Sequence, residues 1–171
     1  GVQTCALPIL GGGVGLSVHG EYRIATERTL FSMPETGIGY FPDVGGSYFL
    51  PRCPGAIGMY LGLSGARLKL GDSLTAGICT HYVPVNSMDV LIQDLEKVSP
   101  GEAAFLEVKG ILSRFGGAFQ DETLTRNRAA IDECFSKDSL DQVLVCLDRF
   151  GDEWSELVAS RIREKSPRSE E

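Results

Sequence analysis

The sequence predicts an α/β protein with short strands and glycine-rich turns in its first half and helices in its second half. A run of glycines within residues 11–15 marks a tight turn. Residues 22–25 and 29–32 combine aromatic, β-branched and apolar side chains, which is typical of short strands. Beyond Pro84, apolar residues recur at helical spacing. With 171 residues and 43% hydrophobic content, the chain can bury a core as one domain.

Further elements of the first half follow from its apolar stretches and turn residues. The expected helices span residues 16–19, 45–50, 56–63 and 72–76. Asp72 is the expected N-cap of the last of these. Residues 79–83 are an expected strand, which Pro84 closes.

Three amphipathic stripes predict helices in the second half. They consist of Phe105, Val108, Leu112 and Phe115, of Leu140, Val143, Leu144 and Leu147, and of Trp154, Leu157, Val158 and Ile162. Asp138 and Asp152 are the expected caps of the last two helices. Residues 163–171 are polar, as expected for a frayed end.

Composition excludes several classes of protein. No apolar run approaches the length of a membrane span. The five cysteines are scattered and lack C-x-x-C spacing, which argues against a disulfide framework or a zinc site and for a reducing compartment. The net charge of −7 arises entirely from residues 84–171, which carry eighteen acidic and eleven basic side chains. Nucleic-acid binding is not expected without a basic stripe.

The glycine run Gly11-Gly12-Gly13-Val14-Gly15 is the first candidate for chemistry. A helix that starts at such a turn directs its unpaired N–H groups at an anion, although a purely structural turn is an equal alternative for an isolated triple glycine. Nucleotide-binding patterns fail, because G-x-G-x-x-G requires glycine at Leu16 and no Gly-Lys-Ser/Thr follows. A serine-hydrolase elbow around Ser17 fails because His19 replaces its closing glycine.

Glu35 and Asp43 are the candidate acids. Each follows a proline among glycines and apolar residues, in the segments Met33-Pro34-Glu35-Thr36-Gly37 and Phe41-Pro42-Asp43-Val44-Gly45. Carboxylates are usually solvated, and that alternative applies to both. Burial in these apolar segments would instead raise a carboxyl pKa towards the value that a general base needs.

These motifs carry a family resemblance. GGGVGLSVHG, MPETGIG and FPDVGGSYFLPR resemble the crotonase (enoyl-CoA hydratase/isomerase) superfamily and, within it, the 3-hydroxyisobutyryl-CoA hydrolase family. The resemblance implies a crotonase-like spiral of ββα units, present in part over residues 11–85, and a helical region over residues 86–171. Residues 1–10 fit this pattern poorly, because Pro8 falls where strand pairing is expected, and they are interpreted as a segment of foreign origin.

The resemblance also implies roles and a substrate. The backbone N–H of Gly12 would be one oxyanion donor. Glu35 would be the catalytic carboxylate, which activates water or attacks the carbonyl itself. Asp43 would be a second acid that binds the substrate hydroxyl or assists proton transfer. The implied reaction is hydrolysis of 3-hydroxyisobutyryl-CoA in valine breakdown, with coenzyme A as part of the substrate and neither cofactor nor metal. The implied setting is the mitochondrial matrix in a eukaryote or the cytoplasm in a bacterium.

Three alternatives remain open at this point. Hydratases of the superfamily carry a catalytic glutamate at the position of Gly15 and no acid at that of Asp43, which disfavours a hydratase or isomerase. The acidic helical region 84–171 could act as a partner-binding module without catalysis. The chain could also be an inactive fragment, since the other oxyanion donor of the family lies upstream; its uncovered strand edges would then favour assembly with another chain, including a homo-oligomer.

Overall fold

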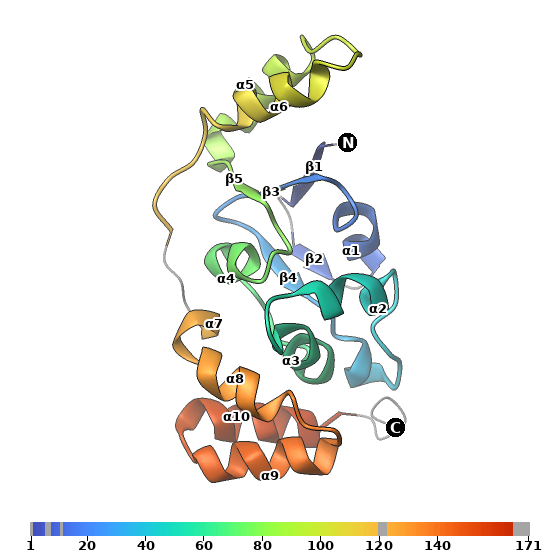
Figure 1. Ribbon diagram of the computed structural model, residues 1–171, viewed down its shortest axis with the longest axis vertical. Coiled ribbons are helices and arrows are strands. Elements are labelled where there is room, and N and C mark those ends of the chain that lie inside the picture. Colours follow the sequence, from blue (N-terminus) through green and yellow to red (C-terminus); the bar gives the residue numbers. More distant parts are fainter. Residues whose placement is uncertain (1, 6–7, 11, 120–122, 166–171) are drawn as a thin grey trace.

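The computed structural model describes residues 2–5, 8–10, 12–119 and 123–165. Parallel strands occupy the centre, and helices α2, α3 and α4 pack around them (Figure 1). Helices α7 to α10 gather at one end of the molecule, whereas α5 and α6 form a hairpin that extends from the other end (Figure 1). Among the described residues, no helix is long and apolar enough to cross a membrane.

The strands form two small parallel sheets. One has the order β1 (Val2–Cys5), β3 (Tyr22–Ala25) and β5 (His81–Tyr82), and the other pairs β2 (Pro8–Leu10) with β4 (Leu30–Ser32). Val2 lies opposite Tyr22, and Pro8 lies opposite Leu30. Each pass of the chain therefore places two strands beside the two strands of the previous pass, which is a spiral of strand pairs. The expected strands 22–25 and 29–32 are confirmed.

Residues 2–5 and 8–10 fit the fold better than the sequence suggested. Both segments are strands in register with the next turn of the spiral. Pro8 is the first residue of its strand, a position where the missing N–H of proline is tolerated. The poor fit expected for residues 1–10 is thus corrected for the part of that segment that the structure describes. A foreign origin stays a prediction.

Helical segments connect and follow the strands. They are α1 (Gly12–Ser17), η1 (Glu35–Ile38), α2 (Gly46–Phe49), η2 (Leu50–Arg52), α3 (Ile57–Ser64), α4 (Leu70–Thr75), η3 (Val85–Ser87), α5 (Met88–Leu95), α6 (Ala104–Leu112), α7 (Thr123–Arg126), α8 (Arg128–Cys134), α9 (Leu140–Phe150) and α10 (Glu153–Arg163). The helix expected at residues 16–19 starts four residues earlier, because Val14, Ser17 and Val18 are buried at helical spacing. The strand expected at 79–83 is shorter, because only His81 and Tyr82 pair in register with β3.

Two of the three expected helix caps are corrected. Asp152 caps α10 as predicted, with its carboxylate accepting from the N–H of Ser155 at 2.7 Å. Helix α9 is capped by Ser139 instead of Asp138, because the Ser139 hydroxyl accepts from the N–H of Gln142. Asp72 lies within α4 and caps a different helix, since its two oxygens accept from the N–H groups of Thr123 and Leu124 at the start of α7.

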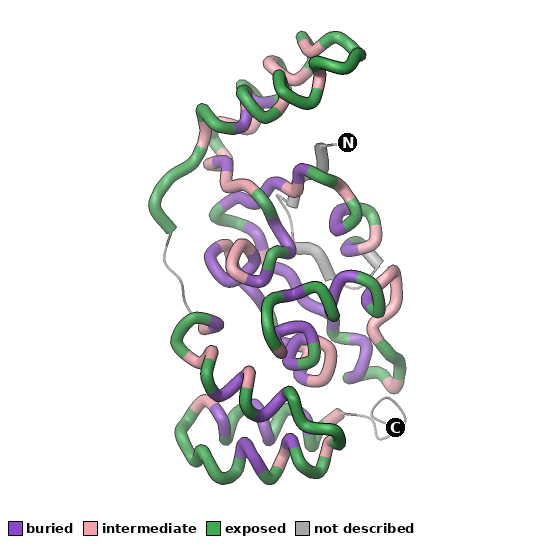
Figure 2. The backbone as a smooth tube through the Cα atoms, in the orientation of Figure 1, coloured by how far each residue is buried: buried purple, intermediate pink, exposed green. Residues whose placement is uncertain are grey.

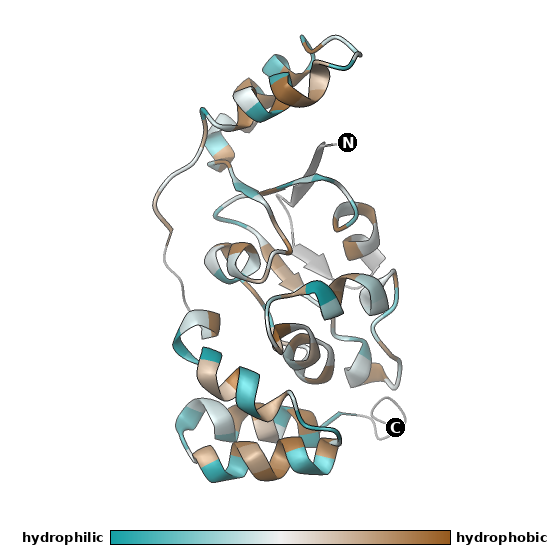
Figure 3. Ribbon diagram, viewed as in Figure 1, coloured by the Kyte–Doolittle hydropathy of each residue, from teal (hydrophilic) through white to brown (hydrophobic). Residues whose placement is uncertain are grey.

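The core confirms most of the helical stripes of the second half, but Phe105 and Leu157 are exposed and Phe115 lies beyond the end of α6. Hydrophobic and hydrophilic residues alternate around α9 and α10 (Figure 3), and Val143, Leu147, Val158 and Ile162 are buried against the strand-bearing half. A second, smaller cluster joins β3 to the α5–α6 hairpin through Tyr22, Ile24, Val83, Leu91 and Leu112. The rest of that hairpin is mostly exposed (Figure 2).

Two of the cysteines that are scattered in the sequence lie together in the structure. Cys134 and Cys146 form a disulfide between α8 and α9, so the interpretation against disulfides is wrong for this pair. Two helices of an antiparallel hairpin bring together residues that lie twelve positions apart. Cys53 and Cys79 are buried and lie outside this disulfide, and burial raises the pKa of the Cys53 thiol to about 11.

Replacement of Asp72 by alanine tests its capping role. The variant leaves two backbone N–H groups of α7 without their acceptor beside a buried site, so we expect a loss of about 1–3 kcal/mol in the free energy of unfolding. Urea unfolding followed by circular dichroism measures the change. Asp138→Ala is the matched control, since Asp138 is exposed and caps no helix. Equal losses in both variants would contradict the assignment.

Candidate active site

The glycine run forms the junction between β2 and α1. Strand β2 ends at Leu10, and α1 begins at Gly12. The first N–H groups of a helix lack acceptors within it, so the start of α1 presents donors at the end of the strand. Val14 anchors the helix in the core, and the hydroxyl of Ser17 donates to the carbonyl of Val14 at 3.2 Å. Ser17 is therefore structural, as the failed elbow pattern indicated.

Glu35 lies in η1, directly after β4. Its side chain is buried, with 6% of the residue exposed, and its Oε2 has no hydrogen-bond partner among the described residues. The carbonyl of Glu35 accepts from the N–H groups of Gly39 and Tyr40, which fixes the turn that carries the carboxyl group. A buried acid with an unpaired oxygen costs folding free energy and is typical of functional sites.

The surroundings of Glu35 favour its protonated form. Burial raises its pKa most strongly. A hydrogen bond from its own backbone N–H lowers the pKa, and the negative charge of Asp43 raises it. The net result is a pKa above the ordinary value, as the apolar sequence context predicted. The charge of Asp43 thus acts on the Glu35 carboxyl group, although eight residues separate the two acids along the chain.

Asp43 occupies a strained turn between η1 and α2. Its Oδ1 is buried and lacks a hydrogen-bond partner among the described residues. Val44 has φ = 44°, in the left-handed region that a β-branched residue rarely adopts, and Gly45 follows with φ = 89°. The ring of His19 bonds the Val44 carbonyl through Nε2 at 3.2 Å. Such strain costs on the order of 1–3 kcal/mol and is concentrated at functional sites.

The Asp43 turn packs directly on helix α1. A Cβ added to Gly15 would lie 2.7 Å from the Cβ of Val44, and one added to Gly45 would lie 2.7 Å from the ring of His19. The absence of a side chain at Gly15 therefore makes room for Val44, the residue after Asp43. This close approach brings the glycine run to the turn that carries Asp43. The sequence identified all three motifs, but it gave no sign of the positioning contact made by His19.

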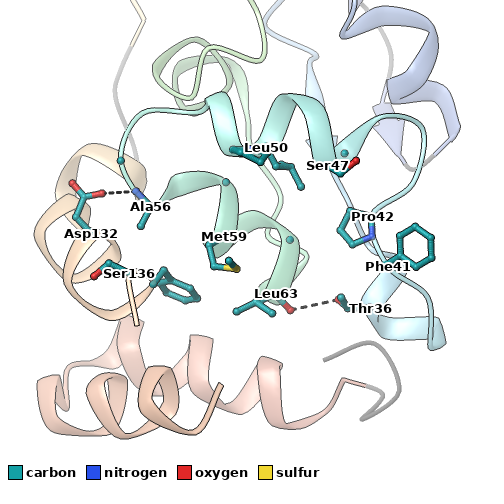
Figure 4. Close-up of a pocket in the computed structure, with 16 residues that line it drawn as sticks. Thr36, Phe41, Pro42, Ser47, Leu50, Ala56, Met59, Leu63, Asp132 and Ser136 are labelled. Carbon is teal, nitrogen blue, oxygen red and sulfur yellow. Dashed lines mark hydrogen bonds between the residues drawn. The ribbon is translucent and has the colours of Figure 1, made fainter. Parts of the chain in front are cut away.

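A cavity of about 630 Å³ is lined by sequence neighbours of both acids (Figure 4), although neither Glu35 nor Asp43 is among its described lining residues. Thr36, which follows Glu35, and Phe41 and Pro42, which precede Asp43, form one end of it. Helix α3 supplies Met59 and Leu63 to its wall. Other lining residues include Ser47, Leu50, Ala56, Asp132, Phe135 and Ser136. The sequence indicated only close packing for residues 56–63, because Asp132 of α8 joins this cavity from 76 positions beyond Ala56.

These features combine the parts of an acid–base site. A buried acid with a raised pKa lies near a second acid, and the N-terminus of a short helix lies close to the turn that carries the second acid. A largely apolar cavity adjoins the acids and can exclude water from bound groups. No cluster of three or more metal-ligating side chains occurs among the residues that the structure describes.

Comparison with known proteins agrees with this arrangement. Residues 8–171 match the family model described as enoyl-CoA hydratase/isomerase. A curated relative from Rattus norvegicus, "3-hydroxyisobutyryl-CoA hydrolase, mitochondrial", is 43% identical over 165 residues, which cover 94% of this chain and 42% of the relative. Another from Neurospora crassa, "Small ribosomal subunit protein mS47", is 40% identical over 177 residues, which cover 94% of this chain and 35% of the relative.

A solved structure extends the comparison to the fold. The carnitinyl-CoA dehydratase from Mycobacterium thermoresistibile is similar with a TM-score of 0.80 and 32% identity, covering 93% of this chain and 44% of that protein. The crotonase-like fold expected from the motifs is thereby confirmed. The chain spans less than half the length of these relatives. On the family match and these identities, the chain belongs to the enoyl-CoA hydratase/isomerase family.

Proposed function

We propose that this chain forms part of an acyl-CoA thioester hydrolase whose substrate is 3-hydroxyisobutyryl-CoA. The observation that carries the proposal is the pair of acids Glu35 and Asp43, which each have a buried carboxyl oxygen without a hydrogen-bond partner among the described residues. An acid whose pKa is raised is a better base at neutral pH than an exposed carboxylate. The rat relative, whose name gives this activity, supports the choice of substrate.

In the proposed reaction, water or Glu35 itself attacks the thioester carbonyl. Ionised Glu35 accepts the proton of the attacking water, or forms an anhydride with the acyl group that water then hydrolyses. The carbonyl oxygen gains negative charge, which the N–H of Gly12 stabilises. The C–S bond breaks, the thiolate of coenzyme A leaves with a proton, and the free acid remains. Asp43 accepts a hydrogen bond from the 3-hydroxyl group or assists proton transfer.

The apolar cavity beside Thr36, Phe41 and Pro42 provides surface for the acyl group or the pantetheine arm. The reaction as proposed requires neither metal nor cofactor, because the attack, proton transfer and charge stabilisation are assigned to protein groups. Following the name of the rat relative, we place the protein in the mitochondrial matrix if its source is eukaryotic, and in the cytoplasm if it is bacterial.

A hydratase reaction is less well supported by the geometry. Syn-hydration in this family uses a second glutamate at the position of Gly15, where the side chain of Val44 occupies the space that a Cβ would need. A non-catalytic role is the second candidate, because the Neurospora relative is named as a ribosomal protein. In that case capture of a protein partner would survive the replacement of Glu35.

The catalytic role proposed for Glu35 can be tested in a chimera, in which this chain replaces the matching segment of the rat relative. We expect Glu35→Gln to lower kcat by at least about 10²–10⁴-fold, the usual contribution of a general base. Hydrolysis is measured from the free thiol of coenzyme A. Glu21→Gln, an exposed acid of the same half, is the control and should retain the activity.

Asp43→Asn in the same chimera separates hydroxyl binding from general acid–base chemistry. If Asp43 bonds the 3-hydroxyl group, the variant should lose more activity on 3-hydroxyacyl thioesters than on plain acyl thioesters of equal length. Comparison of kcat/KM for the two substrate types measures this difference. Equal losses would refute the hydroxyl contact and leave only the proton-transfer role.

The raised pKa of Glu35 predicts a pH-dependent gain in stability for Glu35→Gln. Below about pH 4.5, the ordinary pKa of a glutamate, Glu35 is protonated in the folded and the unfolded chain alike. Its burial then carries no penalty for desolvating a charge. As pH rises above that value, the unfolded chain releases the proton first and the native protein loses stability until the raised pKa is passed. Urea unfolding at several pH values should therefore show an advantage of Glu35→Gln that grows with pH, whereas the exposed Glu107→Gln should show none.

Packing between Gly15 and Val44 predicts strong coupling between these positions. Gly15→Ala should cost about 1–3 kcal/mol of unfolding free energy, because its methyl group overlaps Val44. The same change made in a Val44→Gly background should cost much less, since the overlapping side chain is gone. A double-mutant cycle measures the coupling. Additive effects would show that the contact does not constrain position 15.

A further inference from the structure

The disulfide between α8 and α9 connects the walls of two cavities. Cys134 is the last residue of α8. Asp132 of the same helix and Phe135 and Ser136 directly after it line the cavity of Figure 4. Cys146 of α9 lines a separate cavity of about 410 Å³, which we call the Cys146 cavity. The proposed thioester chemistry uses neither the disulfide nor this second cavity.

Charged side chains surround the sulfur of Cys146. Nη2 of Arg149 donates to Sγ of Cys146 at 3.9 Å, and Lys137 and Asp141 line the same cavity. The same nitrogen of Arg149 lies 3.5 Å from Oε1 of Glu133. Both side chains of this ion pair are more than half exposed, so the pair is weak and leaves the guanidinium available. A cation beside a cysteine sulfur stabilises its thiolate and attracts an anionic thiol.

The two sulfurs of the disulfide differ in their access to solvent. Cys134 is fully buried, and only 1% of Cys146 is exposed. Cys146 nevertheless borders its cavity, which the exposed residues Lys137, Asp141 and Arg149 also line. Exposed side chains change rotamer rapidly, so a small reagent reaches the disulfide from the side of Cys146. The volume of the Cys146 cavity falls within the range of small-ligand sites.

We propose that Cys134 and Cys146 form a thiol–disulfide exchange site, at which a small anionic thiol of the glutathione class reduces the disulfide. Glutathione carries carboxylates and an ammonium group. The carboxylates match the charges of Lys137 and Arg149, and the ammonium group matches that of Asp141. The exchange site stands apart from the proposed function, because it requires only the cross-link and the charged cavity beside it.

The exchange begins when the thiolate of glutathione attacks Sγ of Cys146. A mixed disulfide forms, the bond between the two cysteines breaks, and the sulfur of Cys134 leaves as a thiolate that takes up a proton. A second glutathione thiolate then attacks the glutathione sulfur of the mixed disulfide. Cys146 leaves as a thiolate beside Arg149 and is then protonated. The protein disulfide is reduced to a pair of thiols, and the two glutathione molecules are oxidised to their disulfide.

Reduction releases a restraint on helix α8. The carboxylate of Asp132 accepts from the N–H of Ala56 at 2.9 Å, and the ring of Phe135 packs edge-on against that of Tyr60 with centroids 5.3 Å apart. These contacts join the α8 segment to α3, whereas the disulfide joins it to α9. A cross-link restricts the unfolded chain. The reduced protein should therefore unfold at a lower urea concentration than the oxidised protein.

Mass spectrometry of the full chain tests the exchange. The protein is equilibrated in buffers with graded ratios of reduced to oxidised glutathione, quenched with acid, alkylated and digested. We expect the peptide pair linked through Cys134 and Cys146 to be replaced by two alkylated peptides as the ratio rises. An intact disulfide in folded protein at every ratio, or free thiols at both positions in protein prepared without reductant, would overturn the proposal.

Single-cysteine variants decide which sulfur exchanges. Cys134→Ser lacks the partner that resolves the mixed disulfide, so oxidised glutathione should leave a stable adduct on Cys146. Cys146→Ser should carry several-fold less adduct, because its remaining cysteine, Cys134, is fully buried. Circular dichroism confirms that both variants retain the same helical content. Equal adducts in the two variants would contradict the assignment of Cys146 as the attacked sulfur.

The rate of reduction tests the charges of the Cys146 cavity. Glutathione is compared with uncharged mercaptoethanol at equal thiolate concentration. Arg149→Gln should slow reduction by glutathione about tenfold more than reduction by mercaptoethanol, the lower end of electrostatic steering. Arg163→Gln is the matched control, because its cation pairs with Asp148 and does not line this cavity. Equal slowing of both thiols in Arg149→Gln would rule out docking of an anionic thiol, and equal urea midpoints for the two redox states would rule out the restraint on α8.

Discussion

Parallel pairing between successive passes of the chain is the constraint on which the structure depends. Strands β3 and β4 lie beside β1 and β2 in register, so equivalent ends of each strand pair meet at the same edge. Helix α1 leaves β2 at that edge, and η1 leaves β4. The glycine run and the turn of Glu35 are neighbours because the pairing makes them so.

The candidate site lowers the stability of the fold. Two carboxyl oxygens are buried without partners, and the turn beside them holds a valine in a left-handed conformation. The surrounding core compensates through Ile57, Leu61, Leu147 and Ile162, all fully buried. Under the proposed function, rigid packing around this costly arrangement would hold the two acids in place before substrate binds.

Local patterns of the sequence predicted the parts of the protein that depend on near neighbours. The strand at 22–25, the helix near 56–63 and the Asp152 cap follow from residues within one or two turns. The motifs of Glu35 and Asp43 were recognisable because each is a short, distinctive turn.

Features that depend on distant residues could not be predicted in this way. Asp72 caps a helix that begins 51 residues later, and Cys134 meets Cys146 only because α8 and α9 pack together. Arg67 and Lys165 were separate surface cations in the sequence, yet they line one cavity. The contact of Gly15 with Val44 has a consequence for the history of such chains. A glutamate at position 15 would meet the Cβ of Val44, so a change between the two chemistries requires the turn at position 44 to move or to lose its side chain.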